Sequence, residues 1–223
     1  MPNSLRIVLA AAAVVALLVS LLTSREDDPV RTFLREGWRH PRDWFSPREG
    51  LVAMSRTDVL LAALFAVAAF VLCVLWLRYP AEKVFDEVYY PRAAAEILKH
   101  VDIGGHGPFE YTHPPLTKLV IALSILLFGG LPGGDTTLGW RFLNVVAGAL
   151  MLPLAYAFAK RLTGSTLAAS LAAALLLFDG FRFVQARIAT PEIVVALLAL
   201  AVLYAFYRWW TECEVRVHVA RER

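Results

Sequence analysis

The sequence predicts an all-α protein, a polytopic bundle of about five transmembrane helices with a short external loop of juxtamembrane helices. Hydrophobic residues make up 58% of the 223 residues and charged residues 18%, whereas soluble domains have about 45–50% and about 25%. The apolar residues also gather into uncharged blocks, several of them long enough to cross a hydrocarbon core of roughly 30 Å. A soluble globular domain and a disordered chain are therefore both excluded.

Five apolar blocks are the expected spans: residues 7–24, 59–77, 138–159, 167–178 and 193–207. The first block has a competing interpretation as a signal peptide, because Arg6 gives it a weakly basic start. We favour a membrane anchor, since the block is long and no A-x-A-like cleavage site precedes the polar residues that follow. A sixth block, residues 119–131, is short and interrupted by glycine and proline, which favours an interfacial segment.

The distribution of basic residues sets the expected orientation. With residues 119–131 in the interface, more than half of the 22 Lys and Arg residues fall on the cytoplasmic side, as the positive-inside rule requires. The N-terminus is then external and the C-terminus cytoplasmic. Three regions are expected: an anchor with an Arg-rich cytoplasmic connector (1–57), a membrane module with an external loop at 79–137 (58–210) and a cytoplasmic tail (211–223).

The net charge of +3 is explained by basic residues that flank the apolar blocks, so no nucleic-acid partner is expected. The two cysteines, Cys73 and Cys213, are too few and too distant for a disulfide framework. They also lack the spacing of a metal site.

In this topology an unusual set of polar residues collects at the outer ends of the spans. Charged groups there are costly unless they face water or each other, which makes them functional candidates. The set consists of Asp86, Glu87, His113, Lys118, Arg141, Asp179, Arg182, Arg187 and Glu192. Interfacial solvation explains any single member equally well, whereas their convergence on one face favours a site.

Asp86 and Glu87 directly follow a predicted span and precede a short amphipathic helix with Pro91 in its first turn. Two adjacent carboxylates at the partly dehydrated outer end of a span raise each other's proton affinity, which suits a general base. An acidic helix N-terminus is the competing explanation.

The segment YTHPPLTK, residues 111–118, is a rigid elbow because its two prolines restrict the backbone. His113 is open to three interpretations: a ligand, a base or a hydrogen-bonded elbow residue. Lys118 and Arg141 are expected either to pair with the carboxylates or to hold an anionic lipid head group.

Together these segments resemble the protein O-mannosyltransferase family, most closely its bacterial members. The family belongs to the multi-spanning, lipid-carrier-dependent glycosyltransferases of the C superfamily. The resemblance covers roughly residues 81–207 and rests on an ordered series of motifs. These are FDEVYY (85–90), YTHPPLTK (111–118), GWRF (139–142), Gly148, RLTGST (161–166), FDG (178–180) and QAR (185–187).

The resemblance implies protein O-glycosylation at the plasma membrane. A mannosyl group on a polyprenyl phosphate, a phospholipid carrier, would pass with inversion to a Ser or Thr hydroxyl of a secreted or membrane protein on the external face. Asp86 would be the catalytic base and Glu87 would support it. The residues implied to bind substrate or the lipid phosphate are His113, Lys118, Arg141, Arg182 and Arg187. No cofactor and no divalent metal are expected.

Two features depart from the family pattern. Glu192, behind Thr190 and Pro191, stands where the family usually has an aspartate behind an apolar residue. Family members also have about twice as many spans. The chain is therefore expected to be a fragment, half of a split enzyme or a remnant, with a homologous or complementary subunit as partner. The alternative functions are a sister glycosyltransferase acting on a lipid or glycan, and a truncated non-catalytic lipid-binding subunit.

Overall fold

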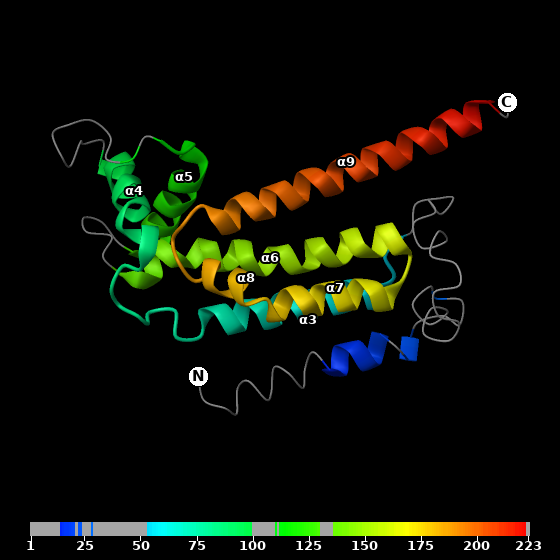
Figure 1. Cartoon of the computed structure of the whole chain (residues 1–223), viewed down its shortest axis with the longest axis horizontal. Coiled ribbons are helices and arrows are strands. Elements are labelled where there is room, and N and C mark those ends of the chain that lie inside the picture. Colours follow the sequence, from blue (N-terminus) through cyan, green and yellow to red (C-terminus); the bar gives the residue numbers. More distant parts are fainter. Residues whose placement is uncertain are drawn as a thin grey trace. The chain divides into compact units, whose positions relative to one another are not determined.

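The structure is a computed structural model, and it describes residues 14–20, 22–23, 28, 53–99, 110, 112–129 and 136–221. Every regular element in this part of the chain is helical (Figure 1), which confirms the all-α class. The elements are α3 (Arg56–Val74), η2 (Phe85–Val88), α4 (Tyr90–Lys99), α5 (Pro115–Ser124), η3 (Ile125–Gly129), α6 (Thr137–Thr163), α7 (Thr166–Phe178), α8 (Gly180–Gln185) and α9 (Glu192–Arg221).

Among the described residues, three helices are long and apolar enough to cross a membrane, and they coincide with three of the expected spans. They are α3, α6 and the Glu192–Cys213 part of α9. By contrast, α7 has only 13 residues, which at the helical rise is roughly 20 Å and less than the roughly 30 Å of a hydrocarbon core. Asp179 follows it as the N-cap of α8, where its side chain accepts the backbone N–H of Arg182. The first expected span, residues 7–24, lies largely outside the described residues.

The prolines of the predicted elbow begin α5. Pro114 is the N-cap and Pro115 the first helical residue, where the missing N–H of proline leaves no hydrogen bond unmade. Pro91 lies in the first turn of α4, as predicted. Together α5 and η3 form a short apolar stretch, Pro115–Gly129, which is shorter than the helices of spanning length. The interfacial position of residues 119–131 stays a prediction.

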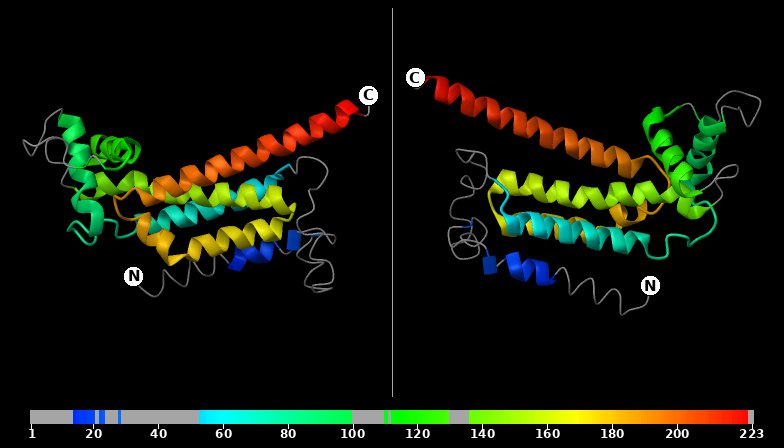
Figure 2. Two further views of the ribbon diagram at one scale, coloured as in Figure 1. Left: turned by 45° about the horizontal axis from the view of Figure 1, so that its top comes forward. Right: turned by 180° about the vertical axis from the view of Figure 1, so that it is seen from behind.

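The chain divides into two compact units. The first comprises Met1–Ala68, Met151–Phe178 and Ala199–Arg223, and the second comprises Ala69–Leu150 and Asp179–Leu198. All seven predicted site residues belong to the second unit. There α4 packs against α5 (Figure 2). The core at this packing comprises Tyr90, Ala94, Ile121, Ala122, Ile125, Trp140 and Ala189.

The first unit has a polar centre at Asp58, in the first turn of α3. This side chain is fully buried. Its carboxylate accepts hydrogen bonds from the hydroxyls of Tyr156 and Thr166, both at 2.9 Å, and lies 3.4 Å from the ammonium of Lys160. Because each polar group has a partner, this buried network holds the ends of α3, α6 and α7 together.

Candidate active site

The centre of the candidate site is a buried ion pair between Glu87 of η2 and Arg141 of α6. Glu87 is 0% exposed and Arg141 is 1% exposed. The Nε of Arg141 donates to Oε1 of Glu87 at 2.6 Å, and Nη2 donates to Oε2 at 2.5 Å. The contact is therefore bidentate, the geometry in which arginine and carboxylate interact most strongly.

The other donors of Arg141 organise the loop that leads into η2. Nη1 donates to the carbonyl oxygens of Leu77 at 3.1 Å and Pro80 at 2.9 Å, and Nη2 donates to the carbonyl of Glu82 at 3.1 Å. With the two bonds to Glu87, all five N–H groups of the guanidinium are used within the protein. Of the two roles left open by the sequence, the structure shows the pairing with a carboxylate.

Glu87 also binds two backbone segments. Its Oε2 accepts the N–H of Val84 at 2.9 Å, and its Oε1 accepts the N–H of Ala189 at 2.8 Å. The first bond forms the capping box at the N-terminus of η2. The second bond ties the loop after α8 to η2.

Asp86 has a different environment from its neighbour Glu87. Its side chain is half-buried, and its carboxylate has no hydrogen-bond or ion-pair partner among the described residues. Phe85, just before it, has φ 55, a left-handed conformation that is uncommon for a residue other than glycine. Such conformations occur at functional sites where the surroundings hold them. Here Glu87 and Arg141 hold the segment on both sides of Phe85.

The elbow is organised by Glu110, a residue that the sequence analysis missed. Its Oε1 accepts the backbone N–H groups of Thr112 at 2.9 Å and His113 at 3.1 Å, and also the Thr112 hydroxyl. The same oxygen lies 2.9 Å from Nδ1 of His113. Its position three residues before His113 was the sequence signal that could have identified Glu110. Of the three interpretations of His113, the structure shows the hydrogen-bonded elbow residue.

Lys118 is also bound within the elbow. Its Nζ lies 2.5 Å from Oε2 of Glu110, and it donates to the carbonyl oxygens of Glu110 at 2.6 Å and His113 at 3.0 Å. Three contacts engage the three N–H groups of the ammonium. Like Arg141, Lys118 is therefore paired with a carboxylate.

Glu110 remains charged over a wide pH range. Burial alone would raise its pKa, but hydrogen bonds from Lys118, Thr112 and His113 outweigh this and lower the pKa to about 2. The ion pair with Lys118 therefore persists at neutral pH. His113 itself is exposed, and its ring lies against that of Tyr90 with 5.6 Å between the ring centroids.

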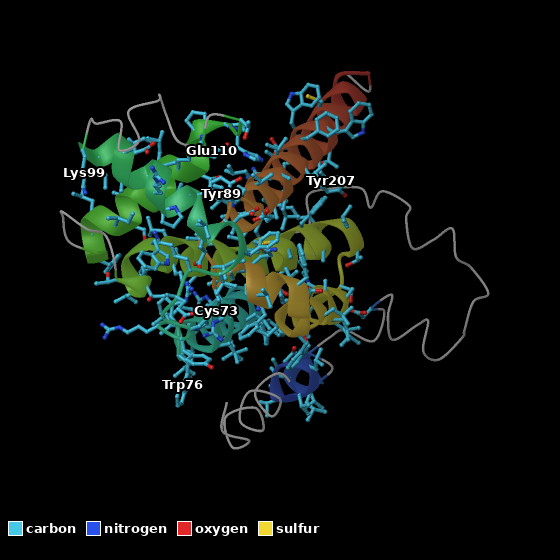
Figure 3. The ribbon with its side chains drawn as sticks, turned by 60° about the vertical axis from the view of Figure 1, so that its left-hand side comes forward. Cys73, Trp76, Tyr89, Lys99, Glu110 and Tyr207 are labelled. Carbon is cyan, nitrogen blue, oxygen red and sulfur yellow. The ribbon has the colours of Figure 1, made fainter. Side chains whose placement is uncertain are left out.

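Tyr90 shows that the elbow and Asp86 share one environment. Its pKa is raised to about 12, first by burial and then by the negative charges of Glu110, Asp86 and Glu192. Three carboxylates from separate segments thus lie within electrostatic range of one phenol. In Figure 3, Glu110 and Tyr89, which precedes Tyr90 in the chain, lie in the region of α4 and α5.

The loop after α8 is held against α6 by Asn144, another residue that the sequence analysis missed. Asn144 is fully buried. Its Nδ2 donates to the carbonyl oxygens of Ile188 at 2.7 Å and Thr190 at 2.9 Å. Asn144 lies three residues after Arg141, so the two side chains share one face of α6. That spacing was the signal that could have identified it.

The same loop contacts α6 closely at Gly148. A Cβ added at this glycine would lie 2.4 Å from the Cβ of Ala186, closer than side-chain carbons approach one another. Gly148 follows Asn144 by four residues and continues the same face of the helix. The loop is therefore fixed at Ala186 and at residues 188–190.

Arg187 lies between these two fixed points. Its Nη2 donates to the carbonyl of Trp76 at 2.7 Å and its guanidinium lies 5.2 Å from the ring centroid of Phe183. Its Nε has no hydrogen-bond partner among the described residues. Burial lowers the pKa of Arg187, and the positive charge of Arg141 lowers it further. A bound anion would favour the charged guanidinium.

Arg182 lies elsewhere, inside the packing of α8. It is 3% exposed. Its Nη1 lies 3.4 Å from the carbonyl oxygen of Gly148 and 3.9 Å from the Sγ of Cys73. Cys73 and Trp76 are both labelled near the end of α3 in Figure 3. Arg182 thus contacts α6 and α3, whereas Arg187 is only half-buried.

In the part of the chain that the structure describes, no group of three or more His, Cys, Asp and Glu side chains is placed to hold a metal ion.

Several known proteins with similar sequences are named mannosyltransferases. The sequence profile described as dolichyl-phosphate-mannose-protein mannosyltransferase matches residues 63–217. A polyprenol-phosphate-mannose–protein mannosyltransferase of Mycolicibacterium smegmatis is 34% identical over 53% of this chain and 22% of its own length. One of Mycobacterium tuberculosis is 28% identical over 90% of this chain and 37% of its own length. Protein O-mannosyl-transferase 1 of Danio rerio is 29% identical over 69% of this chain and 24% of its own length.

The chain thus spans between about a fifth and two fifths of the length of these curated relatives. No solved structure matches it significantly. The profile nevertheless covers more than half of the chain, including every predicted site residue. The chain therefore belongs to the dolichyl-phosphate-mannose-protein mannosyltransferase family.

Proposed function

We propose that this chain transfers a mannosyl group from a polyprenyl-phosphate carrier to Ser or Thr hydroxyls of proteins, with Asp86 as the general base. The names of the relatives support the donor and the acceptor class. The observation that carries the assignment of the base is the difference between two adjacent carboxylates. Glu87 is buried and fully paired, whereas Asp86 is half-buried and has no partner among the described residues.

The division of roles follows from what each carboxylate has available. A general base must be free to accept a proton and must reach the acceptor hydroxyl. Asp86 meets the first condition. The Glu87 carboxylate oxygens, by contrast, already accept hydrogen bonds from Arg141, Val84 and Ala189. We therefore assign Glu87 to positioning Asp86 rather than to proton transfer.

The proposed step balances as an inverting displacement. The acceptor hydroxyl oxygen attacks the anomeric carbon of mannose from the face opposite the phosphate. As it attacks, Asp86 takes the proton of that hydroxyl. The bond between the anomeric carbon and the phosphate oxygen breaks, and the carrier phosphate leaves with the electron pair. The leaving group gains negative charge, so a nearby cation stabilises the transition state more than the ground state.

Arg187 is the best candidate for that cation. Among the basic residues predicted to bind the phosphate, Arg141 and Lys118 have their donors occupied and Arg182 is buried. Arg187 is half-buried, has an unpartnered Nε and is fixed in place by its neighbours in the loop. His113, exposed beside Tyr90, is proposed to line the part of the candidate site that receives the acceptor protein.

We place the reaction at the external face of the plasma membrane. The proposed partners are the polyprenyl-phosphate sugar, a secreted or membrane protein acceptor, membrane lipid and a homologous or complementary subunit. Three apolar helices of spanning length support the membrane location. The phosphate is proposed to be balanced by protein cations, without a divalent metal or other cofactor.

The test is transfer by the full chain in lipid nanodiscs, with polyprenyl-phosphate mannose as donor and a Ser/Thr peptide as acceptor. Asp86→Asn should lower the rate by about 10²-fold or more, the size expected for loss of a general base. Glu212→Gln, which changes an acidic residue of a surface ion pair in the first unit, should leave the rate within about twofold of the unchanged chain.

Three results would contradict the proposal. Full activity of Asp86→Asn would remove the proposed base. Faster transfer from carriers bearing an aminosugar or a pentose would indicate a sister transferase. Binding of polyprenyl phosphate without any transfer, also with a larger homologous subunit added, would indicate a lipid-binding subunit.

A further inference from the structure

We infer that α7 carries a docking surface for the N-terminal helix, which makes the first apolar block a permanent part of the first unit. The N-terminal helix is the helical segment of residues 14–20 and 22–23. The sequence alone leaves this block open as an anchor or a cleaved signal peptide. The family profile begins at residue 63, so it does not describe this segment.

The N-terminal helix meets α7 through a narrow face of small residues. Ala16 is 1% exposed and Ser20 is 0% exposed, and their spacing of four places them on one side of the helix. The hydroxyl of Ser20 donates to the carbonyl of Thr166 at 3.2 Å and is hydrogen-bonded to the hydroxyl of Ser170. Figures 1 and 2 show this helix, in blue, beside α7. Small side chains and interhelical hydroxyl contacts are typical of helices that associate in a membrane.

The other sides of the N-terminal helix are apolar and uncovered. The exposed fractions are 53% for Val14, 54% for Val15, 50% for Leu18 and 78% for Leu22. A helix with small and hydroxyl residues inside and large apolar residues outside reverses the pattern of a soluble bundle. It matches a helix with lipid on one side and another helix on the other.

A second contact lies at the start of α7. Asp28 is 6% exposed, and its Oδ1 accepts the hydroxyl hydrogen of Ser165 at 2.7 Å. The Ser165 oxygen in turn accepts the backbone N–H of Ala168 at 3.0 Å, which caps α7. The N-terminal segment therefore binds α7 along its side and at its first turn.

These contacts continue into the polar centre of the first unit. Ser170 lies close enough to Tyr156 to influence its phenol, and Tyr156 donates to Asp58 at 2.9 Å. A line of buried polar groups thus runs from Ser20 to Asp58. Without the N-terminal helix, the buried Ser170 hydroxyl would lose Ser20 as a partner, which is unfavourable.

The test is disulfide crosslinking in the full chain, with Cys73 and Cys213 replaced by serine. The pair Ser20→Cys and Ser170→Cys replaces two hydroxyls in direct contact, which suits the short Cβ separation of a disulfide. The control pair, Leu18→Cys and Ser170→Cys, moves one thiol about 200° around the helix. After copper–phenanthroline oxidation, maleimide labelling of the first pair should be lower than that of the control pair by about tenfold or more.

A second pair, Asp28→Cys and Ser165→Cys, tests the other contact and should also become protected. The intact mass of the protein from its own membranes should include residues 14–23. Three results would overturn the inference: equal labelling of test and control pairs, a mature chain that lacks these residues, or disulfides that link two chains instead of two positions in one.

Discussion

Glu87 and Arg141 are 54 residues apart in the sequence and form a bidentate ion pair that is closed to solvent. Through this pair α6 is connected to the loop at residues 77–82, to η2 and to the loop after α8. The position of Asp86, next to Glu87 in the chain, therefore depends on a charge pair that takes no part in the proposed proton transfer. Arg187 depends on the same pair through Ala189.

Replacement of Arg141 tests this dependence. Arg141→Met leaves the Glu87 carboxylate buried without a cation and should lower the free energy of unfolding by about 3–5 kcal/mol. Transfer should be lost as well, because the segment around Asp86 is no longer held. Urea or thermal unfolding in detergent measures the first effect. The double variant Glu87→Gln/Arg141→Met should regain part of the stability and none of the activity.

The control for that experiment is an ion pair at the protein surface. Arg208 and Glu212 lie 3.0 Å apart, and their side chains are 46% and 31% exposed. Arg208→Met should therefore change stability by no more than about 1 kcal/mol. If the two single variants were equally stable, Arg141 would not have the organising role that its contacts indicate.

Gly148→Ala tests whether close packing on α6 positions Arg187. Alanine normally stabilises a helix relative to glycine by about 1 kcal/mol. Here the new Cβ would lie 2.4 Å from that of Ala186, so the loop must move, at a cost of about 1–3 kcal/mol. We expect a higher KM for the lipid donor and a smaller change in kcat, measured by transfer at varied donor concentration.

Gly180 provides the matched control, because a Cβ added there meets nothing within 4 Å. Gly180→Ala should keep the donor KM and should not lower stability. An unchanged donor KM in Gly148→Ala would mean that the loop does not place Arg187 for the phosphate.

The sequence predicts helices well where its apolar blocks are continuous, and residue contacts poorly where they depend on the fold. The sequence identifies Asp86, Glu87 and Arg141 as charged residues at the outer ends of spans. Whether Arg141 binds a carboxylate or a phosphate depends on a contact between residues 54 positions apart. Two residues of the candidate site were missed for related reasons. Glu110 is an isolated acid in a polar loop, and Asn144 lies inside an apolar block where its spacing from Arg141 is the only sign.

Glu110→Gln tests the electrostatics of the elbow. The pKa of Glu110 is lowered from 4.5 to about 2, so its stabilisation is complete above pH 4.5 and is lost as the pH falls through about 2. In the unchanged chain, hydrogen-exchange protection of residues 112–118, corrected for intrinsic rates, should fall across this range. Glu110→Gln should show lower protection at neutral pH and no such fall. A fall of the same size in the variant would assign it to another group.

Asp58→Asn tests the polar centre of the first unit. Asp58 lies 3.4 Å from Lys160, and only 10% of the Lys160 side chain is exposed. Neutralising Asp58 leaves this ammonium without a counter-ion, so the free energy of unfolding should fall by about 3–5 kcal/mol. Adding Lys160→Met should restore part of that loss.

Asp179→Asn is the matched control, since asparagine caps a helix about as well as aspartate. Because Asp58 belongs to the first unit, the donor KM of the folded Asp58→Asn chain should stay unchanged, and a raised KM would mean that this network also positions the candidate site.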